Sequence, residues 1–385
     1  MITSAYIHIP FCEHICHYCD FTKFFYDESS ASEYIRALKR EIETAIDGKN
    51  TPIETIFIGG GTPTALNMKQ LQALLDIIDD TFDVTNCNEY TIEANPGDFQ
   101  EDKIKLLKSY GVNRVSLGVQ VFDDAMLKSL GRAHQIKDVY TTINQLKKHG
   151  FTNISIDLIY ALPNQTVDGF LQTVDEALSF GLPHYSSYSL QIEPQTIFYN
   201  RYRRGKLHRP QQEEEVKMYE TLQRKMAENG KLQYEISNFA HPGYESKHNL
   251  TYWNNDFYYG FGAGAHGYLP GKRYGNIRPL PHYIKKSMTD GRPVLHEADI
   301  GLKEKLEEEF FLGLRKRTGI HKGAFKKKFG FPYEKVYKQT VEKLVQQGWL
   351  MEDEHSLRLT EQGVLFGNNV FAQFLLDDND LKHVD

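Results

Sequence analysis

Three of the chain's four cysteines, Cys12, Cys16 and Cys19, lie close together near the start of the sequence with the spacing C-x3-C-x2-C. Three thiolates on one short loop form a soft metal site. A [4Fe–4S] cluster normally takes four cysteine ligands, so three would leave one iron with an exchangeable position. The spacing alone leaves two alternatives open: such a cluster, or a structural zinc ion that also takes His14 or His17. A disulfide is not expected, because three clustered cysteines are an odd set.

A glycine-rich turn, Gly59-Gly60-Gly61-Thr62, follows the apolar residues 54–58. Three glycines after a strand often make only a tight turn. The turn lacks the Gly-Lys-Ser/Thr of a phosphate loop and the G-x-G-x-x-G pattern of dinucleotide-binding proteins. Its functional interpretation is a close approach of the backbone to a ligand.

The elements that would position these groups alternate between apolar strands and amphipathic helices from residue 5 to about residue 230. The predicted strands cover residues 5–9, 54–58, 90–93, 114–119, 154–159 and 185–190. A capping-box pattern at residues 30–33 predicts the start of the first helix. The alternation predicts a parallel sheet with right-handed crossovers, either an open doubly wound sheet or a barrel. Both architectures place a binding site at the carboxyl ends of the strands.

Polar side chains follow four consecutive strands of this predicted sheet, at Glu93, Gln120, Asp157 and Gln191. A single polar residue at a strand end usually belongs to a cap or a turn. Four of them on one rim indicate a binding site for a ligand with several polar groups.

Residues 234–275 carry less charge and more glycine and aromatic residues than the preceding segment. Two short motifs stand out there: H-N-L-T-Y-W at residues 248–253, and a glycine-rich run that contains His266. The simplest interpretation is a glycine-rich loop packed with aromatic side chains around a buried histidine.

Residues 276–302 contain Pro279, Pro281, Gly291 and Pro293, and we expect them to form a linker. The remaining chain predicts the order helix, helix, strand, strand of a winged-helix domain. Such a domain could bind DNA through the lysines at residues 326–328. A packing or docking role is favoured, because the chain has no basic excess.

The bulk composition is that of a globular protein of two or three domains, with 385 residues and a net charge of -6. Nucleic acid is therefore not expected as the main partner. The first 22 residues hold no lysine or arginine, so no secretory signal is expected. No apolar run is long enough to span a membrane. We expect a cytoplasmic protein, where clustered cysteines stay reduced.

The cysteine loop and its flanks, residues 6–12 and 19–21, resemble the signature of the radical S-adenosylmethionine (SAM) superfamily, in the branch of oxygen-independent coproporphyrinogen oxidases and HemW haem chaperones. This resemblance favours a [4Fe–4S] cluster over zinc. It implies a partial (β/α)6 barrel with a small C-terminal winged-helix-like domain, and a SAM site beside the cluster. The implied cluster ligands are Cys12, Cys16 and Cys19. The implied cofactor-binding residues are Tyr6, Tyr18, Gly60, Gly61, Thr62, Glu93, Gln120, Arg132 and Asp157.

Two departures from the oxidase pattern favour the chaperone branch. Phe21 stands where that branch commonly has a fourth cysteine, and only eleven residues precede Cys12. The word at residues 248–253 resembles an H-N-x-x-Y-W motif associated with haem binding in the HemW group. A neutral imidazole can bind haem iron, so His248 is the candidate axial ligand and His266 a second candidate. The alternative is a coproporphyrinogen III oxidase that forms protoporphyrinogen by radical SAM decarboxylation.

The resemblance implies haem, haem-acceptor proteins of respiration and a reducing flavodoxin or ferredoxin as partners. Peripheral membrane contact and a homodimer are compatible with it, whereas nucleic acid is not expected. The predicted divisions are 1–235 for the partial barrel, 236–290 for a segment that completes the barrel and holds haem, and 300–385 for the C-terminal domain.

Overall fold

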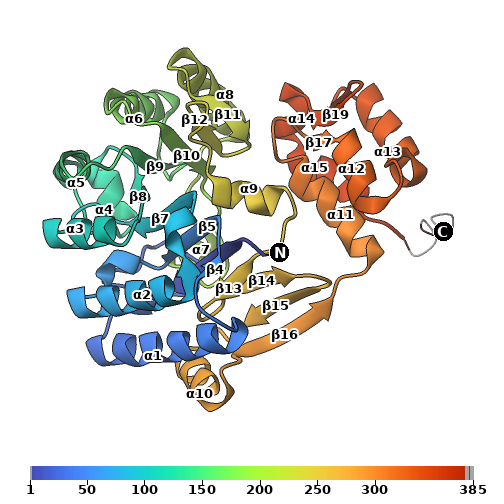
Figure 1. Ribbon diagram of the computed structural model, residues 1–385. Helices are drawn as coiled ribbons and strands as arrows, with labels where there is room; N and C mark the ends of the chain where they lie inside the picture. The colour runs from blue at the N-terminus through green and yellow to red at the C-terminus, as the bar shows by residue number, and fades with distance from the viewer. Residues whose placement is uncertain (1, 378–380, 382–385) are drawn as a thin grey trace.

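The structure, a computed structural model, describes residues 2–377 and 381 (Figure 1). Its main sheet has the strand order β11-β12-β10-β9-β8-β7-β5-β1-β13. Six neighbouring strands run parallel. They are β1 (Ser4–Ile9), β5 (Thr55–Gly60), β7 (Glu89–Ala94), β8 (Arg114–Gln120), β9 (Asn153–Tyr160) and β10 (His184–Ser189). Most side chains of these strands, on either face of the sheet, are apolar and buried, as expected for a parallel sheet.

The sheet is a partial barrel. Helices α1 (Glu28–Ala45), α2 (Met68–Thr81), α3 (Glu101–Ser109), α5 (Ile136–Lys148), α6 (Val167–Ser179) and α8 (Gln212–Glu228) follow an arc outside the strands (Figure 1). A doubly wound sheet would carry helices on both faces. One edge ends at β13 (Tyr259–Phe261), which runs parallel to β1. The other ends at the antiparallel pair β11 (Leu232–Glu235) and β12 (Asn238–Ala240). The predicted partial barrel is confirmed.

Helices α1 and α2 each begin after a residue whose side chain caps the helix, and one predicted helix start is wrong. Asn67 caps α2 in a capping box with Gln70. The capping box predicted at residues 30–33 is wrong, because α1 already begins at Glu28. Asp27 is its cap and accepts a hydrogen bond of 2.8 Å from the Ser30 backbone N–H. Aspartate is as good a capping residue as serine, and Asp27 comes before Ser30 in the chain, so the helix already begins after Asp27.

The linker predicted for residues 276–302 is wrong. This stretch forms α10 (Leu280–Asp290) and β16 (Val294–Asp299). Pro279 caps α10 and Pro281 lies in its first turn, where the missing N–H costs nothing. Gly291 ends the helix at a φ of 70°, the left-handed conformation that glycine adopts freely. β16 joins β14 (His266–Leu269) and β15 (Lys272–Asn276) in a separate antiparallel sheet.

A buried carboxylate of the barrel anchors α9 (Lys247–Trp253), the helix that carries the H-N-L-T-Y-W word. Glu89, at the start of β7, accepts hydrogen bonds from the backbone N–H groups of Lys247 and His248, at 2.8 and 3.0 Å. It also accepts one from the Ser246 hydroxyl at 3.1 Å. A negative charge at a helix N-terminus satisfies donors that have no partner inside the helix.

We expect Glu89→Ala to lower the free energy of unfolding by about 2–4 kcal/mol, because three donors lose a buried charged acceptor. Denaturant unfolding measures this loss. Glu54→Ala, at an exposed carboxylate beside β5, is the control and should stay within about 0.5 kcal/mol of the wild type. A loss below about 1 kcal/mol for Glu89→Ala would mean that water replaces the carboxylate at α9.

The C-terminal part has winged-helix order. Its elements are α11 (Leu302–Gly313), β17 (Ile320–His321), α12 (Lys322–Phe329), α13 (Glu334–Gln346), β18 (Leu350–Glu352) and β19 (Ser356–Leu359). Lys328, from the predicted basic run, pairs with Glu309 at 2.6 Å and donates to the Asn255 carbonyl at 3.1 Å. It therefore joins this domain to the end of α9, which supports the docking role. Residues 378–380 and 382–385 of the predicted 300–385 segment lie outside the described residues. No helix among the described residues is long and apolar enough to cross a membrane.

Candidate functional site

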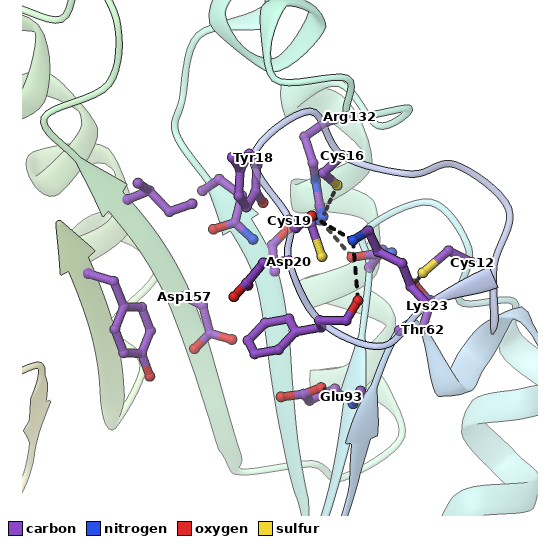
Figure 2. Close-up of a pocket in the computed structure, with 18 of the residues that line it drawn as sticks. Cys12, Cys16, Tyr18, Cys19, Asp20, Lys23, Thr62, Glu93, Arg132 and Asp157 are labelled. Carbon is purple, nitrogen blue, oxygen red and sulfur yellow. Dashed lines mark hydrogen bonds between the residues drawn. The ribbon is translucent and has the colours of Figure 1, made fainter. Parts of the chain in front are cut away.

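One cavity of about 370 Å³ opens at the carboxyl ends of the parallel strands, a volume typical of small-molecule sites. It brings together the three clustered cysteines and polar residues from successive strand ends (Figure 2). The predicted site residues that line it are Cys12, Cys16, Tyr18, Cys19, Gly60, Gly61, Thr62, Glu93, Gln120, Arg132, Asp157 and Gln191.

The cysteine loop is tied down at both ends and in its middle. The short strands β2 (Phe11–Cys12) and β3 (Phe24–Phe25) pair and close the loop. The backbone N–H of His17 donates to the Leu130 carbonyl at 2.8 Å, and its ring Nδ1 lies 2.8 Å from the Ser129 carbonyl. His17 therefore anchors the loop to the end of α4 (Asp124–Ser129).

The three sulfur atoms differ in their surroundings. Cys12 is buried, and its sulfur accepts a hydrogen bond of 3.6 Å from the Thr62 hydroxyl. Cys16 accepts one of 3.3 Å from the Arg132 guanidinium. Burial raises the pKa of the Cys12 thiol to about 11 and also raises the pKa of Cys19. These groups become thiolates at neutral pH only when a metal replaces their protons.

The thiols are spread around the cavity. No three His, Cys, Asp or Glu side chains in the described ranges, 2–377 and 381, are grouped closely enough to hold one metal ion. A structural zinc ion needs its ligands around a single point. A four-iron cluster takes each thiolate on a different iron, and three cysteines that line one cavity match the kind of donor set that such a cluster uses.

The glycine turn lies directly against the cysteine loop. Gly60 has a φ of 118°, which side chains rarely adopt, and its N–H donates to Glu93 at 2.9 Å. A Cβ atom on Gly61 would lie 2.9 Å from the Cys12 sulfur and 2.8 Å from the Phe11 carbonyl oxygen. The turn needs glycine because the loop approaches its backbone this closely.

Two half-buried carboxyl groups, Glu93 and Asp157, line the cavity at the strand ends. Burial, and then the nearby Asp157, raise the pKa of Glu93 to about 7, although the Gly60 N–H opposes this. Burial also raises the pKa of Asp157, whose carboxylate accepts hydrogen bonds of 3.1 Å from the Ser116 hydroxyl. Neither carboxylate forms an ion pair with a lysine or arginine of the described chain. A cationic ligand such as a sulfonium or an ammonium group would favour ionisation of both.

Gln120 enters the cavity through a strained backbone. Its φ is 72°, unusual for a residue with a side chain. The register between β8 and β9 shifts at this point, so Gln120 stands opposite Leu158 after Gly118 stands opposite Asp157. Such strain is often kept where it aims a side chain at a ligand.

Tyr6, His248 and His266, which are further candidates from the sequence, do not line this cavity. The Tyr6 hydroxyl lies 2.8 Å from His8 Nδ1, on the part of β1 that runs beneath the loop. His248 is fully buried, with Nδ1 2.9 Å from the Thr55 hydroxyl and Nε2 2.8 Å from the Tyr252 hydroxyl. Both of its ring nitrogens are therefore occupied.

Some lining residues were not predicted. Asn95 accepts from Arg132 at 2.6 Å and donates to Thr62 at 2.9 Å, so it connects the loop to the glycine turn. Lys23 donates to the Cys19 carbonyl at 2.6 Å. Asn95 directly follows the strand that ends near Glu93, a signal that could have found it, whereas nothing in the sequence marks Lys23.

Comparison with known proteins agrees with this geometry. Residues 6–177 match the Radical SAM superfamily, and residues 300–366 match the HemN C-terminal domain. A partial barrel with three cysteines on the loop after its first strand, followed by this second domain, defines a radical SAM protein. The superfamily implies a [4Fe–4S] cluster and SAM as cofactors.

The chain is 47% identical to a protein named Heme chaperone HemW from Bacillus subtilis, over 97% of this chain and 99% of that protein. It is also 47% identical to Heme chaperone HemW of Lactococcus lactis, over 97% of this chain and 98% of that protein. Within the radical SAM superfamily, the chain belongs to the HemW family. The coproporphyrinogen III oxidase HemN of Escherichia coli has the same fold, with a TM-score of 0.84 and 21% identity, over 97% of this chain and 90% of that one.

Proposed function

We propose that this protein is a haem chaperone of the cytoplasm that binds haem and delivers it to haem-dependent proteins, including respiratory ones. Two HemW relatives at 47% identity over nearly the whole chain carry this proposal. The likeness to the E. coli oxidase supports the fold alone, because that protein is only 21% identical.

The proposed cluster ligands are Cys12, Cys16 and Cys19. When held there, the cluster would supply one-electron chemistry beside the SAM site. Glu93 and Asp157 would compensate the positive charges of SAM, and the backbone of the glycine turn offers donors and acceptors. Arg132 would hold Cys16 and Asn95 in place, and Tyr18 and Gln120 close the cavity. Tyr6 would act beneath the loop, through His8.

A surface groove along α9 and α11 supports haem binding. Trp253, Phe311 and Leu312 are shared by its two halves. Arg315 lies over the Trp253 ring at 4.5 Å, and Tyr252 and Arg273 line the second half. Flat aromatic surface suits a porphyrin, and arginine pairs with its carboxylates. His248 could serve as axial ligand only after losing one of its two ring hydrogen bonds.

The same proposal includes particular partner proteins. We propose a reducing flavodoxin or ferredoxin as electron donor, haem-requiring respiratory proteins as acceptors, and a homodimer as the assembled form. Peripheral contact with the membrane would bring the protein near its acceptors.

Haem titration of the wild type and of Trp253→Ala tests this proposal. We expect the variant to bind haem up to about 10-fold more weakly, since an aromatic ring pair contributes roughly 0.5–1.5 kcal/mol beyond its buried area. Trp349→Ala is the matched control, because it removes the chain's other tryptophan, which stacks on Phe366 in the C-terminal domain. Soret absorption gives both affinities.

The same preparation separates chaperone from oxidase. A haem chaperone should restore activity to a haem-free respiratory enzyme and leave coproporphyrinogen unchanged. Turnover of coproporphyrinogen without haem binding would contradict the proposed function.

A further inference from the structure

Lys23 is held at the edge of the cluster cavity, beside the last cysteine of the loop. Its ammonium group donates to the Cys19 carbonyl at 2.6 Å and to the Phe21 carbonyl at 3.2 Å. The side chain is half-buried and lines the cavity. Figure 2 shows the contact between Lys23 and Cys19 as a dashed line. A positive charge therefore lies next to one of the three proposed cluster ligands.

The backbone on both sides of Lys23 is tied to the barrel. The Thr22 carbonyl lies 2.8 Å from His8 Nε2, and the Phe24 N–H donates to the Pro10 carbonyl at 2.7 Å. The lysine side chain thus leaves the backbone at a defined place and ends on two carbonyl acceptors. Its ammonium group has less freedom than that of a surface lysine.

The charge of Lys23 is not neutralised at close range. Both of its acceptors are backbone carbonyls, which carry no net charge. Asp20 also lines the cavity, but it is exposed and forms no ion pair with Lys23 in the part of the chain that the structure describes. Water screens an exposed charge more than a half-buried one.

Among the described residues, one other lysine or arginine lines the cavity, namely Arg132. Its guanidinium donates to Cys16 Sγ at 3.3 Å, to Asn95 at 2.6 Å and to the Gly118 carbonyl. Replacing Arg132 would therefore disturb the cysteine loop and two strand ends together. The hydrogen bonds of Lys23 go to carbonyls of the loop, so its charge can be removed with less disturbance.

A positive charge beside Cys19 favours additional negative charge at this end of the loop. Burial raises the pKa of the Cys19 thiol, and the charge of Lys23 opposes this rise. Reduction of an iron–sulfur cluster adds one electron, and so one negative charge, with no bond formed or broken. The net charge and the hydrogen bonds around the ligands help to set its reduction potential.

We propose that Lys23 is a positioning residue whose fixed ammonium group raises the reduction potential of the cluster. One electron passes from the flavodoxin or ferredoxin proposed above, which is oxidised, to the cluster, which is reduced. With the ammonium group in place, a weaker donor can carry out this transfer. The inference rests on the proposed cluster ligands Cys12, Cys16 and Cys19.

The test measures the reduction potential in the full chain, reconstituted anaerobically without SAM or haem. Redox dyes set the solution potential, and electron paramagnetic resonance gives the fraction of loaded clusters that is reduced. Lys23→Gln removes the charge and keeps an N–H donor for the carbonyls, whereas Lys23→Arg keeps the charge. Lys103→Gln is the matched control, because Lys103 also donates to a backbone carbonyl, that of Thr64 at 2.6 Å, but does not line the cavity.

At the potential that reduces half of the wild-type clusters, we expect the ratio of reduced to oxidised cluster to fall about 10-fold in Lys23→Gln. For a one-electron couple this fall corresponds to a potential about 59 mV lower. Lys23→Arg and Lys103→Gln should stay within about 2-fold of the wild type, because neither removes the charge beside Cys19.

Asp20→Asn gives a second measurement of the same electrostatic effect. It removes a negative charge from the loop, so the ratio of reduced to oxidised cluster should rise. The rise should be smaller than the fall in Lys23→Gln, since Asp20 is exposed. This variant leaves Lys23 in place and tests the inference even if Lys23→Gln takes up little cluster. A fall in Asp20→Asn would contradict the inference.

Equal falls in Lys23→Gln and Lys23→Arg would assign Lys23 to the shape of the loop and overturn the inference. An unchanged ratio in Lys23→Gln would also overturn it. In both cases the cluster ligands and the proposed function stand. A wild type that takes up no cluster would instead refute the proposed ligands, and the inference with them.

Discussion

Replacing Cys16 with alanine is expected to abolish cluster binding: iron and sulfide per chain should fall to background after anaerobic reconstitution. Three thiolates bind three of the four irons and leave the fourth for SAM, whereas two thiolates would leave a second iron without a protein ligand. The visible absorption of the cluster should disappear with the iron, and SAM affinity should fall with it.

The control for this variant is Cys87→Ala. The Cys87 thiol donates to backbone carbonyls of Glu54 and Glu89, away from the cavity, so its loss should leave the iron content unchanged. A Cys16→Ala protein with a full complement of iron would show that Cys16 is not a ligand. Zinc in place of iron in the wild type would instead support the alternative of a structural zinc site.

Glu93→Gln should weaken SAM binding by about 10- to 100-fold, because a hydrogen bond to a charged acceptor is worth about 1.5–3 kcal/mol. Wild-type affinity should rise about 10-fold between pH 6 and pH 8, since the pKa of Glu93 is about 7 and the cationic ligand prefers the ionised form. In Glu93→Gln this dependence on pH should be reduced. Calorimetry at several pH values measures both effects.

The same substitution should stabilise the ligand-free protein above pH 7. The folded pKa of Glu93 lies above its value in an unfolded chain, so its contribution to stability is present below about pH 4.5. That contribution is lost as the pH rises towards 7, by at most about 3 kcal/mol. Glutamine cannot ionise and avoids this loss.

Glu41→Gln is the matched control for Glu93→Gln. Burial raises the pKa of Glu41 to about 7 as well, but its carboxylate accepts from the Gly262 N–H at 3.0 Å and from Asn276 at 2.6 Å, outside the cavity. It should change the pH dependence of unfolding without changing SAM affinity. Equal losses of SAM affinity in both variants would contradict a direct role for Glu93.

The cluster site could be predicted from sequence because its parts obey local rules. Cysteine spacing marks the loop, and parallel strands bring their carboxyl ends to one rim, so Glu93, Gln120 and Asp157 converge there. The strand alternation also predicts the sheet. The remaining choice, a partial barrel instead of a doubly wound sheet, required the resemblance because periodicity is the same in both.

What the sequence could not predict depends on contacts between distant residues. A buried histidine was expected in this segment, but the Thr55 hydroxyl that occupies His248 Nδ1 lies 193 positions earlier, so this partner leaves no local signal. His266 and His296 lie on either side of Gly275 only because of the register of β14, β15 and β16. Prolines and glycines at residues 276–302 mark helix ends as readily as loops, which explains the wrongly predicted linker.

The pairing of β1 with β13 has a consequence for how the protein is made. The cysteine loop leaves the ribosome among the first residues, yet the strand that completes the sheet beside β1 follows about 250 residues later. At about 5–20 residues per second, the nascent chain exposes its three thiols for roughly 12–50 s before β13 can dock. Iron and sulfide delivered within that interval would reach a cysteine loop whose supporting sheet is incomplete. The assembly machinery should therefore act after translation is nearly complete.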